Sequence, residues 1–236
     1  MSSIVGGPVC TRFARGALCV SFLPPGCRLC SFDCTYCVFE HGQRREGWPS
    51  PGEIASAVTH ALGEDTIFDA IAIAGPGEQT LHPQFGLAVA NVLSARQVRP
   101  ELPLQIHTNG TTLHRPSVRR ALELADERVV HIDAGGQSVS RGAGAAQPGV
   151  AITALGALSN FSVETVFVDG RAGNTDSQSI DQWVQLVEEL RPTQVYVTTI
   201  DKPPVGPGTH PVSLSRLEDI AEWVRCEAHV PALAYA

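Results

Sequence analysis

The sequence predicts an α/β fold, namely a partial (β/α)6 TIM-like barrel of parallel strands. Six short runs rich in Val, Ile, Leu and Ala alternate with longer helical patterns. Such an alternation implies a parallel sheet with right-handed crossovers. The most polar residues follow the ends of the predicted strands, where barrels carry their active sites. No clear G-x-G-x-x-G motif is present, which favours an incomplete barrel over a dinucleotide-binding sheet.

The six predicted units follow one another along the chain. The predicted strands are 17–23, 68–74, 102–108, 128–133, 162–168 and 194–200. The predicted helices are 51–62, one within 83–98, 116–125, 149–158, 179–190 and 213–226. A length of 236 residues fits one core domain. We expect it to comprise an N-terminal extension (1–16), a loop with four of the chain's cysteines (24–50) and a C-terminal loop and helix (201–236).

Composition excludes several classes of protein. Hydrophobic residues make up 43% and charged residues 17%, as in ordinary globular proteins. No apolar run is long enough to span a membrane, and no secretory signal is visible, so we expect a cytoplasmic protein. The formal net charge of −7 argues against a nucleic acid as partner, because polyanions bind basic patches.

Four of the seven cysteines lie within eleven residues, at positions 27, 30, 34 and 37. In a reducing compartment such clustering indicates metal binding rather than disulfides. Cys30, Cys34 and Cys37 form a C-x3-C-x2-C motif, and thiolates are the usual ligands of iron–sulfur clusters. Three ligands on a four-iron cluster leave one iron open to a small molecule.

Two other interpretations of the cysteine loop stay open. Cys27 extends the motif to C-x2-C-x3-C-x2-C, which could be a tetrathiolate zinc site, although the middle spacer is short for one. The cysteines could also be buried and inert, which is improbable for four in a polar loop.

The C-S-F-D-C-T-Y-C loop, with its aromatic residue before the last cysteine, resembles the signature of the radical S-adenosylmethionine (SAM) superfamily. The resemblance implies that Cys30, Cys34 and Cys37 hold a [4Fe–4S] cluster whose open iron is chelated by SAM. It implies reductive cleavage of SAM, a 5′-deoxyadenosyl radical and hydrogen abstraction from a substrate. An external electron donor such as flavodoxin or ferredoxin would then be a partner.

Motifs after the next strands support the same resemblance. G-P-G-E-Q-T-L-H, from Gly75 to His82, is similar to the family's glycine–glutamate motif. The resemblance implies that Gly75 and Gly77 admit the SAM amino group and that Glu78 accepts its hydrogen bond. The resemblance also implies four further contacts to SAM. They are Thr108 and Asn109 in the T-N-G segment, Asp133 in the D-A-G segment, and Tyr36 at the aromatic position of the cysteine loop.

Nearly the whole chain resembles short proteins similar to wyosine-tRNA biosynthesis radical SAM enzymes. There are departures from the family's usual pattern: Gln79 replaces a proline, Lys202 replaces an arginine, and Cys27 lies in an apparent insertion. By strand alternation, the residues expected to face the substrate are His107, His131, Glu164 and, on a loop, Lys202. The alternative for each is a structural or solvated side chain.

The sequence therefore predicts a radical SAM enzyme, an iron–sulfur oxidoreductase or lyase acting on a small molecule or peptide. Two alternatives remain. One is a tRNA base-modifying enzyme of the same superfamily. The other is a non-catalytic zinc or iron–sulfur module, whose metal binding would not depend on Glu78.

Overall fold

The computed structural model describes residues 4–11, 14–24, 28–38, 47–134, 140–141, 155–156, 158–202 and 208–236. The chain divides into two compact units. The first unit takes its residues from 1–30, 41–108 and 112–128, and the second from 31–40, 109–111 and 129–236.

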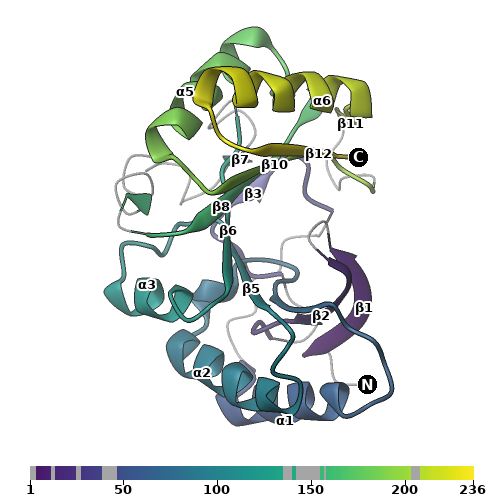
Figure 1. The fold of residues 1–236 in the computed structure, drawn as a ribbon, viewed down its shortest axis with the longest axis vertical. Coiled ribbons are helices and arrows are strands. Elements are labelled where there is room, and N and C mark those ends of the chain that lie inside the picture. Colours follow the sequence, from purple (N-terminus) through teal and green to yellow (C-terminus); the bar gives the residue numbers. More distant parts are fainter. Residues whose placement is uncertain are drawn as a thin grey trace. The chain divides into compact units, whose positions relative to one another are not determined.

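The first unit is built on four strands in the order β1-β2-β4-β5. β1 (Val5–Thr11) pairs antiparallel with β2 (Ala14–Val20), and β2, β4 (Ala70–Ile73) and β5 (Leu104–Thr108) are parallel. The helical segments are α1 (Pro51–Leu62), η1 (Gln79–Leu81), α2 (Phe85–Ala95), η2 (Arg96–Val98) and α3 (Pro116–Leu122). α1 and α2 lie side by side (Figure 1). β6 (Glu127–His131) begins in this unit and ends in the second.

Local sequence explains α1 well. Ser50 and Glu53 form a reciprocal capping box, and Pro51 takes the first helical position, where its missing N–H has no cost. Ile54 and Val58 are fully buried on one face of the helix. Burial of this stripe, rather than helix propensity alone, holds the helix against its neighbours.

The second unit contains the parallel strands β8 (Phe161–Val166), β10 (Gln194–Thr198) and β12 (Ala232–Tyr235). Two small antiparallel pairs are β3 (Asp33–Cys34) with β7 (Ser140–Arg141), and β9 (Val168–Gly170) with β11 (Thr209–Pro211). Its helices are α5 (Ser177–Leu190) and α6 (Leu214–Trp223), the latter continued by a π-type turn, η4 (Val224–Ala228). α6 packs against β10 and β12, above which it is drawn in Figure 1.

The α/β class with a mostly parallel sheet is confirmed, and the predicted boundaries differ from the observed ones by a few residues at most strand ends. The first predicted strand, 17–23, begins earlier, because Ala14–Val20 pairs with β1. β12 was not predicted, since four residues near the chain end give little periodicity; it adds a parallel strand beside β10. The predicted helix 149–158 lies mostly outside the described residues.

Candidate cofactor site

A backbone bridge joins the start of the cysteine loop to the glycine loop in the first unit. Leu29 and Gly77 form an isolated parallel bridge, and the Glu78 N–H donates to the Leu29 carbonyl at 2.8 Å. Gly77 has φ +123°, and a Cβ there would stand 2.1 Å from the Leu29 oxygen. Only glycine fits this approach. Gly77 is therefore needed by the protein's own backbone next to Cys30, whatever it does for a cofactor.

Glu78 lies in a nest of hydroxyl groups, and its side chain is only 2% exposed. Its Oε1 atom accepts hydrogen bonds from the Thr80 N–H at 3.2 Å, the Thr80 hydroxyl at 2.5 Å and the Thr108 hydroxyl at 2.7 Å. The Thr80 hydroxyl also bonds that of Thr112. Hydrogen bonds of this kind stabilise a charged carboxylate. They also show that Thr108, predicted as a SAM contact, holds Glu78 in place.

Gly75 has φ +145° and lies beside two polar atoms. A Cβ on Gly75 would stand 3.4 Å from the Gln79 Nε2 atom and 3.4 Å from the Ser21 hydroxyl oxygen. Gln79 is 1% exposed, and its Nε2 has no hydrogen-bond partner among the described residues. A buried donor with no partner costs about 1–3 kcal/mol, so this position suits a bound group with acceptor oxygens.

The cysteine ligands predicted from the motif are divided between the units. Cys30 belongs to the first unit, and Cys34 and Cys37 belong to the second. Cys34 lies in β3, and the Cys37 N–H donates to the Cys34 carbonyl at 3.1 Å in a tight turn. All three are half-buried thiols rather than disulfides. In the part of the chain that the structure describes, no three His, Cys, Asp or Glu side chains are grouped to hold a metal.

Asn109, predicted as a SAM contact, closes a small network on the cysteine loop. Its Nδ2 donates to the Ser31 hydroxyl at 2.9 Å, and its Oδ1 accepts from the Thr111 N–H at 3.1 Å and the Thr111 hydroxyl at 2.8 Å. The Ser31 and Thr111 hydroxyls share a hydrogen bond of 2.6 Å. This arrangement fixes the residue that follows Cys30.

Tyr36, His131 and Asp133 form one hydrogen-bonded cluster in the second unit. The Tyr36 hydroxyl donates to Asp133 Oδ2 at 2.5 Å and lies 2.6 Å from His131 Nε2, which is 3.0 Å from Asp133 Oδ1. Burial, and then the negative charges of Asp133 and Cys34, raise the pKa of Tyr36 well above its usual value. The phenol therefore stays protonated and ties the cysteine loop to the end of β6.

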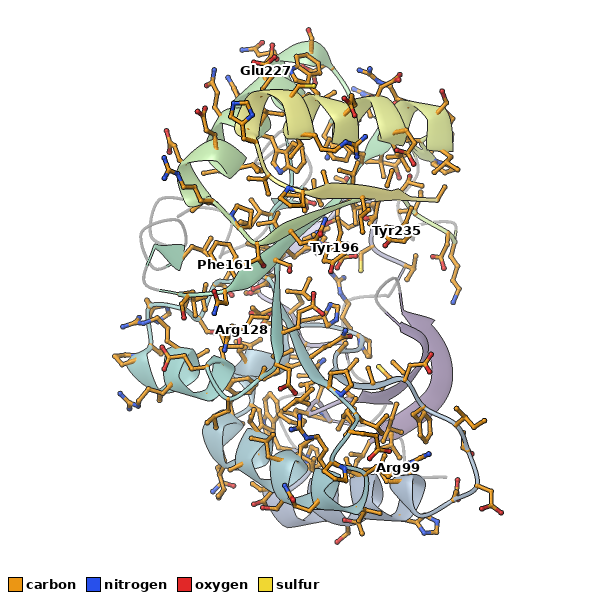
Figure 2. The ribbon with its side chains drawn as sticks, viewed as in Figure 1. Arg99, Arg128, Phe161, Tyr196, Glu227 and Tyr235 are labelled. Carbon is orange, nitrogen blue, oxygen red and sulfur yellow. The ribbon has the colours of Figure 1, made fainter. Side chains whose placement is uncertain are left out.

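The other predicted substrate-facing residues are spread along the strands. His107 on β5 and Glu164 on β8 are half-buried, and Lys202 is exposed after β10. Glu164 is in register with Tyr196 on β10. The Tyr196 ring lies 6.3 Å from that of Tyr235 on β12, as labelled in Figure 2. This partly exposed pair was missed because β12 itself was missed.

Sequence reasoning also missed the hydroxyl nest around Glu78, the Gln79 donor and the role of Asn174. Asn174 is fully buried. Its Oδ1 accepts from the Val168 N–H at 2.8 Å, and its Nδ2 donates to the Ala134 carbonyl at 3.3 Å and the Val166 carbonyl at 2.9 Å. It thus joins the end of β8 to the D-A-G segment. Cys27 lies outside the described residues.

A family model described as the radical SAM superfamily matches residues 25–149, more than half of the chain. Among curated proteins, a UPF0026 protein of Methanocaldococcus jannaschii is 24% identical over 217 residues, covering 86% of this chain and 65% of its own. A GTPase Obg of Brachyspira hyodysenteriae is 28% identical over 135 residues, covering 56% of this chain and 19% of its own. The chain thus spans less than two thirds of these relatives.

Solved structures show the same fold at low identity. Streptococcus suis SuiB bound to S-adenosylmethionine matches with a TM-score of 0.66 and 14% identity, over 89% of this chain and 49% of SuiB. TYW1 with a lysine-pyruvate adduct bound matches with a TM-score of 0.60 and 14% identity, over 88% of this chain and 72% of TYW1. anSMEcpe with bound AdoMet and a peptide matches with a TM-score of 0.57 and 18% identity, over 78% of this chain and 50% of anSMEcpe. These matches confirm the predicted fold class.

As for membrane insertion, the helices among the described residues include none with the length and apolar character that a bilayer crossing requires.

Proposed function

This chain belongs to the radical SAM superfamily, and we propose that it is an enzyme that holds a [4Fe–4S] cluster on Cys30, Cys34 and Cys37 and binds SAM. The observation that carries the proposal is the Leu29–Gly77 bridge. It ties the residue before the first cysteine of the motif to the glycine loop that resembles the family's SAM-binding segment. Once bound and reduced, this cofactor pair would supply a 5′-deoxyadenosyl radical.

We assign the residues of the cysteine loop and the glycine loop to two groups. Some would bind the cluster or SAM, and others orient the residues that do. Three thiolates are the donor set expected for a cluster with one open iron. The unpartnered Gln79 Nε2 beside Gly75 fits a cofactor rich in acceptor oxygens. Glu78 is expected to face the SAM ammonium, with its own orientation fixed by Thr80 and Thr108. Tyr36, Asn109 and Asp133, predicted as SAM contacts, also hold the cysteine loop through the hydrogen bonds described above.

The substrate is proposed to be a small molecule or a peptide, met by His107, His131, Glu164 and Lys202. The fold likeness to anSMEcpe, solved with a peptide bound, supports the peptide class. The electron donor is proposed to be flavodoxin or ferredoxin, and the proposed location of the protein is the cytoplasm.

A second candidate function is modification of a tRNA base. The likeness to TYW1 favours it, whereas the net charge of −7 counts against a polyanionic substrate. Binding of bulk tRNA measured across a salt series tests this candidate. A steep loss of affinity with salt would support it, and no binding at low salt would exclude it.

The test of the main proposal is anaerobic reconstitution with iron and sulfide, reduction with dithionite, and detection of 5′-deoxyadenosine after SAM is added. The wild-type protein should form the product. Cys34→Ala should lose both the cluster absorbance and the product, while Cys226→Ala, an exposed thiol on η4, should keep both. If the protein binds zinc, and the protein reconstituted with iron and sulfide and then reduced yields no 5′-deoxyadenosine, the chain is a non-catalytic module instead.

A further inference from the structure

The side chain of Gln79 has a hydrogen-bond partner for one amide atom and, among the described residues, none for the other. Its Oε1 accepts a hydrogen bond from the Phe22 N–H at 2.7 Å. A backbone N–H can only donate, so the oxygen must face Phe22 and the NH2 group must face the other way. No described residue accepts from that NH2 group, although Gln79 is almost completely buried.

The NH2 group points to the place where Gly75 has no side chain. Gly75 is exposed, and the position that its Cβ would take is 3.4 Å from both Gln79 Nε2 and Ser21 Oγ. Ser21 Oγ accepts from the Leu23 N–H at 3.3 Å, which leaves its hydroxyl hydrogen to donate. Two donors, from η1 and from the residue after β2, therefore lie beside the same face of Gly75 in the first unit.

We propose that Gln79 Nε2 and Ser21 Oγ form a donor pair that binds the carboxylate of the amino-acid part of SAM. This inference rests on the proposed function. Two convergent donors suit a carboxylate, which only accepts hydrogen bonds. Gly75 lies on the same short loop as Gly77, whose backbone is bonded to Leu29 next to Cys30. The carboxylate and ammonium of SAM share one carbon, so one loop can meet both groups.

The proposal gives Gln79 a role that the usual proline of the family cannot have. Proline has no side-chain donor. The departure from the family motif at this position would thus add a polar contact to SAM rather than only loosen the loop. Thr108, Asn109 and Asp133, assigned to SAM by resemblance, already make hydrogen bonds within the protein.

The experiment compares two ligands on the reconstituted, unreduced enzyme, where SAM binds but is not cleaved. SAM and decarboxylated SAM are titrated by calorimetry into the wild type, Gln79→Glu and Ser21→Ala. Gln79→Glu keeps the acceptor for the Phe22 N–H and replaces only the donor. We expect it to weaken SAM roughly 10- to 100-fold, as for a lost hydrogen bond to a charged group, and to change decarboxylated SAM little. Ser21→Ala should act in the same direction more mildly.

The controls separate this inference from the proposed function. Gln178→Glu adds the same charge at an exposed position of α5 and should change neither affinity. If Gln79→Glu does not fold, Ser21→Ala alone decides the question. Equal losses for the two ligands, or no loss for either as expected if a buried water accepts from Gln79, would overturn the inference. If the wild type itself does not bind SAM, the proposed function fails instead.

Discussion

Replacing Gly77 by alanine should destabilise the first unit and lower the iron content of the protein. A non-glycine residue at φ +123° costs about 1–3 kcal/mol. The new Cβ would stand 2.1 Å from the Leu29 oxygen, so Leu29 must move away and the Glu78 N–H loses its acceptor. That loss adds roughly 0.5–1.5 kcal/mol. The two effects together amount to about 1.5–4.5 kcal/mol.

For a domain of this size each kcal/mol lowers the melting temperature by about 2–4 °C, so we expect a fall of roughly 3–18 °C. The assay is thermal unfolding of the cluster-free protein followed by circular dichroism, with iron content measured after reconstitution. Gly52→Ala is the matched control, because a Cβ there meets nothing within 4 Å and the residue lies in helix α1. If Gly77→Ala melts with the wild type and takes up iron normally, the close approach to Leu29 is not a constraint and the reasoning is wrong.

Three further predictions concern side-chain contacts. Tyr36→Phe should cost about 1–3 kcal/mol in urea unfolding, because Asp133 loses a buried hydrogen bond; an unchanged midpoint would contradict the cluster. Glu78→Ala should destabilise more than Glu78→Gln, which keeps an acceptor for the donors of Thr80 and Thr108; equal midpoints would contradict the nest. Burial lowers the pKa of His82, partly offset by its bond to the Pro49 carbonyl. The unfolded chain therefore binds more protons than the folded one, and stability should fall as pH drops below about 6.5. In thermal melts at successive pH values, His82→Asn should reduce the dependence of the melting temperature on pH. An unchanged dependence would contradict the assignment to His82.

Patterns that repeat in sequence were predictable, and contacts between distant side chains were not. The helix over 51–62 follows from a capping box and an apolar stripe, both of which are local. The glycine loop after β4 was found through its motif. The motif could not show that Gly77 meets Leu29, because that contact joins residues far apart in sequence and is made by backbone atoms. Rules based on residues that are neighbours in sequence do not predict such pairs.

Hydroxyl and amide side chains account for most of what the sequence did not predict at the site. Threonine occurs on strands, in turns and on surfaces alike, so Thr80 and Thr112 gave no signal before the fold brought them to Glu78. Gln79 was noted only as a missing proline. Its pairing with the Phe22 N–H depends on how β2 and η1 pack, which no spacing rule encodes. The Tyr36 cluster likewise needs two segments 95 residues apart.

The hydrogen bonds around Ser31 bear on how the protein would acquire its iron. Asn109, Ser31 and Thr111 hold the residue after Cys30 through hydrogen bonds among their side chains. Part of the conformational entropy of the cysteine loop should thus be lost on folding rather than on metal uptake. Small zinc domains behave in the opposite way, since they unfold when the metal is removed. This chain should therefore survive oxidative loss of a cluster as a folded protein and accept a new one, so that repair rather than resynthesis restores it.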